Sequence, residues 1–404
     1  MAKIGIRARL TIFSCSMLTG IAGAEPPNEL IDAGREILNT KDHDAGVHKI
    51  ERAIALLEKQ IAADPDGADL HYQLGRACYF LERDDTALRE FDRAIALDPK
   101  HSGAYFFKGV ILRLRDDADQ ASKALQKACA LDPENSNVWT EYGLALLDVD
   151  DKKEARRAFE KALRANDRNS QALFQLSIFN YEDGNHALAL DQMRKSIEIA
   201  PEAIGAHYNL GQWYQLAGEN KMALEQFRDV VRLDPDDERA LAKVVQCSQA
   251  LHQSEERDDA RRSLQQLHKA GKTKAEFFCR EQFGVGDFNV MVFEYFELNG
   301  DEPVRYSFQV LRKGRQKPIY RISLGSYDLT NEFFHAKGDM PAAQRVFHLD
   351  RYFPTGKHET FAFYRGEPAY DVVRPTVIEI IKGTRKPTSS MTPTSQGATI
   401  ELSD

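Results

Sequence analysis

The stretch Arg89–Pro99, "REFDRAIALDP", decides the fold because the chain repeats it. It returns as "SKALQKACALDP" at Ser122–Pro133 and as "EQFRDVVRLDP" at Glu225–Pro235. Each copy spaces its apolar residues as one face of a helix would and ends at a proline, which cannot continue the helix. A phrase that recurs in this way predicts stacked copies of one structural unit.

Aligning the prolines shows the period of the repeat. They fall on a 34-residue grid, in which Asp167 fills one missing slot: Pro65, Pro99, Pro133, Pro201 and Pro235. A glycine column, broken by Ser177, shares the grid: Gly75, Gly109, Gly143 and Gly211. So do an alanine column and a bulky column: Ala87, Ala121, Ala155, Ala189 and Ala223, with Phe91, Leu125, Phe159, Met193 and Phe227. Small residues let helix axes approach closely, and the bulky column fills the remaining gap.

These columns resemble the tetratricopeptide repeat. The third unit carries "WTEYGLALL" from Trp139, followed by Ala155 and Phe159, and the resemblance covers five units over residues 68–237. It implies two antiparallel helices per unit, stacked into a right-handed superhelix whose concave groove usually holds a segment of another protein. Residues 25–67 read as a degenerate first repeat or cap. Residues 238–273 read as capping helices and a linker.

One stripe on each first helix is not used by this packing. It consists of residues in two columns four positions apart, which lie on the same side of a helix. The resemblance implies that these residues line the groove: Tyr72, Arg76, Phe106, Val110, Leu144, Phe174, Ile178, Tyr208 and Gln212. Most are aromatic or aliphatic, whereas the carboxylate-clamping members of the family need lysine and asparagine there. We therefore expect an apolar peptide or protein surface as partner. Alternatively, the stripe is covered from within the molecule.

Residues 274–383 follow a different pattern and predict a smaller α+β domain with a largely antiparallel sheet. Five runs read as strands: Phe288–Leu298, Val304–Leu311, Ile319–Leu324, Arg345–Phe353 and Glu359–Tyr364. Two segments read as helices, Tyr327–Lys337 and Tyr370–Lys382. The tail, residues 384–404, is rich in Ser, Thr and Pro, and we expect it to be disordered.

The strongest candidate for chemistry in this domain is a set of four residues. His348 and Asp350 share one face of a predicted strand, and His358 and His335 lie nearby in the sequence, as in a metal site. The opposite face of that strand is apolar, so a solvated polar face explains the pattern better. No nucleophile, zinc or phosphate-binding motif occurs, and we expect neither a catalytic residue nor a cofactor.

The N-terminus reads as a secretory signal. Basic residues precede the apolar run Leu10–Ala22, and small residues at 22–24 predict cleavage after Ala24. The mature chain is then periplasmic or secreted, without a stable membrane anchor.

The mature chain has four cysteines, Cys78, Cys129, Cys247 and Cys279. The first two fall in helical patterns and favour buried free thiols, although the compartment would permit disulfides. A net charge of −8 argues against a nucleic-acid partner.

The sequence thus predicts a multidomain protein, an all-α tetratricopeptide superhelix followed by an α+β domain. The favoured function is an exported, non-catalytic adaptor that binds a protein or peptide segment. The alternative is an envelope enzyme whose C-terminal domain acts on a substrate that the repeat array recruits.

Overall fold

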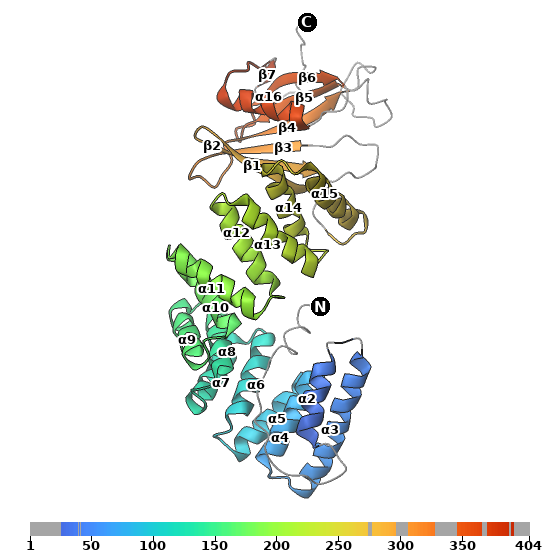
Figure 1. Ribbon diagram of the computed structural model, residues 1–404, viewed down its shortest axis with the longest axis vertical. Helices are drawn as coiled ribbons and strands as arrows, with labels where there is room; N and C mark the ends of the chain where they lie inside the picture. Colours follow the sequence, from blue (N-terminus) through green and yellow to red (C-terminus); the bar gives the residue numbers. More distant parts are fainter. Residues whose placement is uncertain are drawn as a thin grey trace. The chain divides into compact units, whose positions relative to one another are not determined.

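The computed structural model describes residues 26–38, 40, 42–273, 277–295, 306–327, 346–365, 370–387 and 389–391. The predicted signal segment lies outside them. The chain divides into two compact units, which meet in the sequence at Glu202 and Ala203. Figure 1 shows the order of elements along the chain. No helix in the described part is both long and apolar enough to cross a bilayer.

The first unit consists of helix pairs. The bounds are α2 Pro27–Leu38, α3 His43–Ala63, α4 Ala68–Phe80, α5 Asp84–Leu97, α6 Ser102–Leu114, α7 Ala118–Leu131, α8 Ser136–Asp148, α9 Lys152–Ala165, α10 Ser170–Glu182 and α11 His186–Ile199. Side chains such as Asp117, Asn135 and Asp151 accept hydrogen bonds from backbone N–H groups in the first turns of the helices that follow them. These capping residues stabilise the first turn of each helix, at the boundary between a turn and the apolar pattern of the helix.

The glycine column sets the distance between the two helices of a repeat. A Cβ atom added at Gly75 would lie 2.6 Å from the Phe91 ring, and one at Gly143 would lie 2.7 Å from the Phe159 ring. Both rings are fully buried. The predicted close packing of glycine against the bulky column is therefore confirmed, because any side chain here would displace an aromatic ring.

The degenerate first repeat also forms a helix pair. Its second helix, α3, has 21 residues, against 14 in α5. A Cβ at Gly34 of α2 would lie only 2.9 Å from the carbonyl oxygen of Gly46 in α3. The two backbones thus approach through glycines on both helices.

The second unit begins with four more helices. They are α12 Ile204–Leu216, α13 Asn220–Leu233, α14 Glu238–Ala250 and α15 Ser254–Lys269. The helices α14 and α15 lie where the sequence predicts capping helices, and α14 contacts the sheet that follows. Gln246 Nε2 of α14 donates to the carbonyl oxygen of Cys279, 2.7 Å away in the edge strand of the following sheet. An uncovered strand edge has unpaired backbone groups, and α14 covers this one.

The described sheet has seven strands, each hydrogen-bonded to its sequence neighbours in antiparallel fashion. They are β1 Phe277–Val285, β2 Phe288–Tyr295, β3 Tyr306–Arg312, β4 Tyr320–Tyr327, β5 Val346–Tyr352, β6 His358–Arg365 and β7 Ser389–Met391. Five strands match the predicted runs, whereas β1 was not predicted. The expectation of a wholly disordered tail is wrong for residues 389–391, because backbone pairing with β6 makes them a strand. The segment predicted as a helix from Tyr327 lies, beyond that residue, outside the described part.

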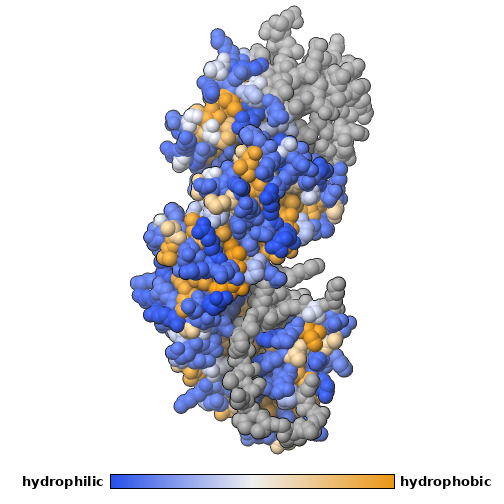
Figure 2. Space-filling model, in the orientation of Figure 1, coloured by the Kyte–Doolittle hydropathy of each residue, from blue (hydrophilic) through white to orange (hydrophobic). Residues whose placement is uncertain are grey.

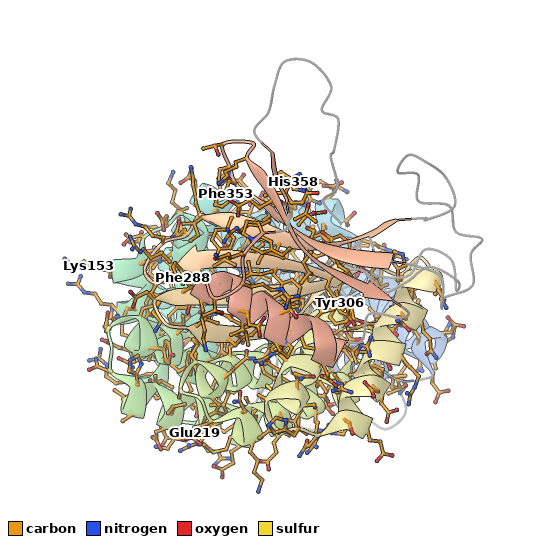
Figure 3. All side chains as sticks on the ribbon, turned by 90° about the horizontal axis from the view of Figure 1, so that it is seen from above. Lys153, Glu219, Phe288, Tyr306, Phe353 and His358 are labelled. Atoms are coloured by element: carbon orange, nitrogen blue, oxygen red, sulfur yellow. The ribbon has the colours of Figure 1, made fainter. Side chains whose placement is uncertain are left out.

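Helix α16, Tyr370–Lys382, crosses one face of this sheet (Figure 3) and confirms the second predicted helix. Its residues Val373, Val377 and Ile380 are buried in one cluster with strand residues. The strand members of that cluster include Val290, Val292, Phe308, Val310, Ile322, Leu349 and Phe361. Because strand residues alternate between faces, this cluster defines the covered side of the sheet.

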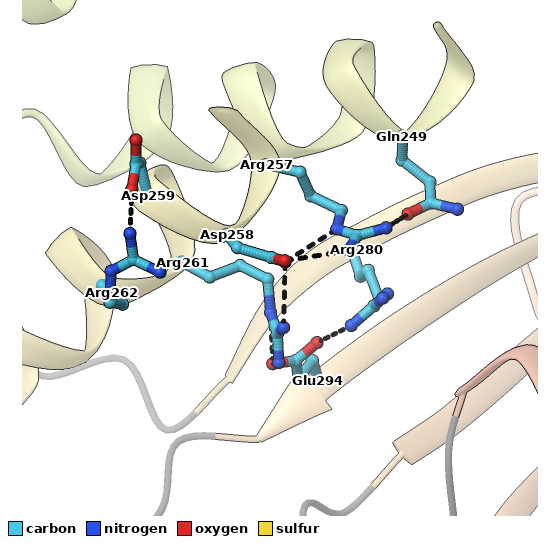
Figure 4. Close-up of polar contacts among 8 residues, drawn as sticks. All are labelled: Gln249, Arg257, Asp258, Asp259, Arg261, Arg262, Arg280 and Glu294. Carbon is cyan, nitrogen blue, oxygen red and sulfur yellow. Dashed lines mark hydrogen bonds and ion pairs between the residues drawn. The ribbon is translucent and has the colours of Figure 1, made fainter. Parts of the chain in front are cut away.

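Buried charges join α15 to the sheet (Figure 4). Glu294 of β2 is 1% exposed, and its carboxylate accepts hydrogen bonds from Arg261 of α15 and from Arg280 of β1. The Arg280 guanidinium also lies 4.2 Å from the centroid of the Tyr370 ring in α16. Burial raises the pKa of Tyr306, beside this cluster, to about 12. The helices and the sheet of the second unit therefore share a charged core.

Candidate protein-binding face

The candidate binding residues lie on the first helix of each repeat. Two come from each of α4, α6, α10 and α12, and Leu144 comes from α8. Since the second unit is a separate body, its two residues are described apart from the other seven. The helix assignments agree with the predicted placement, but the exposure of the residues differs along the chain.

Three of the four stripe residues in the first two complete repeats are buried. Arg76 is 5% exposed, Phe106 is 3% and Val110 is 1%, so the prediction that these three line an accessible groove is wrong. Arg76 Nη2 donates to Asp32 of α2 over 2.7 Å. Phe106 and Val110 belong to the hydrophobic core of the first unit. These three side chains thus take part in packing within the first unit.

Tyr72 packs toward the next repeat. Its ring centroid lies 4.4 Å from that of His101, and a Cβ at Gly103 would lie 2.8 Å from the Tyr72 hydroxyl oxygen. Burial raises the pKa of its hydroxyl. Gly103 therefore leaves room for the ring, and Tyr72 remains partly exposed.

The stripe is open on α8 and α10. Leu144, Phe174 and Ile178 are each partly exposed, as are their apolar neighbours Leu147 and Tyr181. Hydrophobic side chains also reach the surface over α10 and α11 (Figure 2). Within the first unit, α8 and α10 thus carry partly exposed aliphatic and aromatic members of the stripe side by side. We call these five residues the α8–α10 face.

A buried cluster of hydrogen-bonded side chains, which we call the Asn169 latch, connects α8 to α10 and was not predicted from the sequence. Asn169, which caps α10, donates through Nδ2 to Ser136 Oγ at 2.7 Å and to Thr140 Oγ1 at 2.8 Å. Its Oδ1 accepts from the backbone N–H of Ala172. All three polar side chains are at most 8% exposed. The helix-cap signal at Asn169 was visible in the sequence, but its partners one repeat earlier were not.

In the second unit the stripe becomes polar. Tyr208 is partly covered by the Arg239 guanidinium, 5.1 Å from its ring centroid, and Gln212 is partly exposed. Gln215, one turn further, binds Lys243 Nζ through its side-chain oxygen at 2.8 Å. Tyr208 and Gln212 therefore have a different chemical surrounding from the α8–α10 face.

Carboxylates lie beside the apolar residues of α8. Arg113 of α6 donates to Glu141 at 3.0 Å, and its other terminal nitrogen lies 3.7 Å from Asp148. Burial raises the pKa of Glu141, while the Arg113 charge opposes that rise. Glu141 is thus satisfied inside the array, whereas Asp148 remains exposed at its rim.

In the sheet, two of the four candidate metal ligands come together. His358 Nε2 lies 3.0 Å from Asp350 Oδ1, and Thr360 donates to the same oxygen at 2.7 Å. The side chain of His348 and the whole of His335 lie outside the described part. Among the described residues, no group of three or more His, Cys, Asp or Glu side chains is placed to hold a metal ion. The Asp350 carboxylate is bound by neighbours on β6.

Comparison with protein families settles the nature of the helical array. Models described as tetratricopeptide repeat match residues 46–106, 81–136, 141–204 and 204–237. Residues 46–237 are tetratricopeptide repeats. The predicted resemblance is confirmed, and with it the fold class of an α-helical repeat array followed by an α+β region. Arrays of this family are protein-interaction scaffolds, and that broad class applies to this chain.

Solved structures with similar repeats are distant in sequence. YrrB, a TPR protein with an unusual peptide-binding site, is 24% identical, with a TM-score of 0.39, over 46% of this chain and 95% of YrrB. Pseudomonas aeruginosa PilF is 17% identical, with a TM-score of 0.46, over 51% of this chain and 93% of PilF. Yeast Tom70 is 16% identical, with a TM-score of 0.47, over 67% of this chain and 62% of Tom70. No curated protein matches this chain.

Proposed function

We propose that this tetratricopeptide repeat protein is a non-catalytic adaptor that binds an apolar segment of another protein on the α8–α10 face. The observation that carries the proposal is the exposure pattern of the stripe. Phe106 is buried, whereas Phe174, in the same column of the repeat two units later, is partly exposed together with Ile178 and Leu144. Aromatic and aliphatic anchors next to one another are the usual energetic centre of a protein interface.

The α8–α10 face suits an apolar partner better than a charged chain terminus. Its five members are Leu144, Leu147, Phe174, Ile178 and Tyr181. None carries a positive charge that could hold a terminal carboxylate. The Asn169 latch keeps α8 and α10 in one arrangement, and a face that is already ordered loses less entropy when it binds.

The experiment is site-specific photo-crosslinking in the full-length protein. A benzophenone amino acid at position 174 should form covalent adducts with a partner in cells that express the protein, whereas the same amino acid at the exposed position 160 on α9 should not. Leu144→Ala and Ile178→Ala should together reduce the adduct formed at position 174. Equal adducts at positions 174 and 160 would refute a partner on this face.

We also propose that the adaptor is exported. The support is the order of basic, apolar and small residues over positions 3–24. Mass spectrometry of the intact protein from an extracytoplasmic fraction should give a mature chain that begins at Glu25. Detection of the uncleaved chain in the cytoplasm alone would contradict export.

A further inference from the structure

The α8–α10 face ends in carboxylates on both of its helices. Four residues after Leu144 comes Asp148, the last residue of α8, and four residues after Ile178 comes Glu182, the last residue of α10. Residues four apart in a helix lie on the same side. The apolar surface therefore runs into two exposed acidic groups at the same end of two adjacent helices.

These carboxylates are unfavourable where they stand. The C-terminus of a helix carries a partial negative charge, which favours lysine or arginine in the last turn. Helix α6 follows this rule with Arg113, whereas α8 and α10 have no basic residue in the last turn. Two helix ends and two acidic side chains thus add negative potential at one edge of the apolar face.

The charges are only partly neutralised within the described part of the chain. Asp148 has Arg113 at 3.7 Å, but its side chain remains 45% exposed. Arg156 pairs with Asp183 at 2.6 Å rather than with the adjacent Glu182. Among the described residues Glu182 makes no ion pair, so its carboxylate is available to a cation from outside.

We propose that the segment bound on the α8–α10 face carries a lysine or arginine directly beside its apolar anchors. This inference rests on the proposed function and adds the charge of the partner. The four-residue spacing corresponds to a rise of about 6 Å along the helix, which an extended peptide covers in about two residues. The basic residue is therefore expected within about two positions of an anchor.

The probes are three fluorescent peptides with the same core, Leu-Ala-Phe-Ala-Leu, flanked on both sides by Lys-Lys, Gln-Gln or Glu-Glu. Their affinity for the full-length mature protein is measured by fluorescence anisotropy. In 50 mM salt the lysine peptide should bind about 3- to 10-fold more tightly than the glutamine peptide, and the glutamate peptide should bind most weakly. In 500 mM salt the differences should shrink below about 2-fold, since exposed charges are screened.

Substitutions at the two carboxylates test whether they cause the preference for the lysine peptide. Asp148→Asn with Glu182→Gln should remove most of the lysine preference and leave the affinity of the glutamine peptide unchanged. Glu160→Gln, at an exposed position on α9, is the matched control and should preserve the preference. Equal binding of the lysine and glutamine peptides overturns the charge inference alone. The proposed function fails together with the charge inference if none of the three peptides binds and Phe174→Ala leaves the capture of the cellular partner unchanged.

Discussion

Ser177 and Met193 pack against each other at the point where a repeat departs from the glycine column. Ser177 Oγ lies 3.8 Å from Met193 Sδ, and both residues are at most 2% exposed. In the preceding repeat the same two positions hold Gly143 and Phe159. A flexible methionine tolerates the added hydroxymethyl group, whereas a rigid ring requires glycine. In this repeat both columns therefore depart from the pattern at the same contact.

The first prediction concerns replacing the Gly143–Phe159 pair by serine and methionine, the residues of the following repeat. Gly143→Ser should lower the free energy of unfolding by about 1–3 kcal/mol, because the new side chain would overpack Phe159. Adding Phe159→Met should recover part of this loss, with a coupling energy of at least about 0.5 kcal/mol. The coupling energy is measured by urea denaturation of the wild type, the two single variants and the double variant. If the changes in unfolding free energy of the single variants simply add up in the double variant, the two positions do not constrain each other.

The second prediction concerns a left-handed turn that recurs between the two helices of a repeat. Glu82 has φ +59° and Asp116 has φ +63°, while Gly184 and Gly218 occupy the same column in later repeats. A longer side chain without local hydrogen bonding suits this conformation less well than aspartate. Glu82→Gly should therefore stabilise the protein by up to about 1 kcal/mol, and Asp116→Gly should do so less. The melting temperatures of the two variants show whether Glu82→Gly stabilises the protein more than Asp116→Gly does. A lower melting temperature for Glu82→Gly than for the wild type would contradict the prediction.

The third prediction tests the charged core of the second unit. Glu294→Gln should cost about 3–5 kcal/mol, because it removes the negative charge that the buried Arg280 and the partly buried Arg261 share. Hydrogen exchange should accelerate in α15 and β1 in particular. The control is Asp259→Asn, which breaks the exposed Arg262–Asp259 pair of the same helix and should cost less than about 0.5 kcal/mol. Equal effects of the two substitutions would contradict a special role for Glu294.

The fourth prediction concerns thiol reactivity. Cys78, Cys129 and Cys247 are buried free thiols, and burial raises the pKa of Cys78 to about 11 and that of Cys129 to about 12. Because only the thiolate reacts, these groups stay protonated and inert at pH 8. Iodoacetamide followed by mass spectrometry should modify the half-buried Cys279 first and the other three only in denaturant. Rapid alkylation of native Cys129 would show that its helix opens.

The fifth prediction separates packing from binding on the stripe. Phe106→Ala should cost about 3–5 kcal/mol, as expected for a buried phenylalanine, whereas Phe174→Ala should cost much less and weaken partner capture instead. Thermal unfolding and the affinity for the lysine peptide, measured on both variants, distinguish these effects. A large stability loss in Phe174→Ala with unchanged capture would assign Phe174 to the core as well.

The repeat itself could be read from the sequence because its physics is local. Helix stripes, proline stops and the match between glycine and bulky columns recur every 34 residues, and each depends on contacts within one unit or with its neighbour. Five strands of the sheet followed from alternation and turn residues for the same reason. Strand β1 was missed because its charged residues Arg280 and Glu281 break that alternation, while their partners lie on β2 and α16.

Tertiary structure alone decided which part of the stripe a partner can reach. Phe106 and Phe174 occupy equivalent positions in the sequence repeat, yet one is sealed in the core and the other is partly exposed. Likewise, only the fold revealed that α14 covers a strand edge and that Glu294 joins a repeat helix to the sheet. A periodic sequence determines the unit and its neighbours, but exposure and buried charge pairs depend on residues that meet only when the chain has folded.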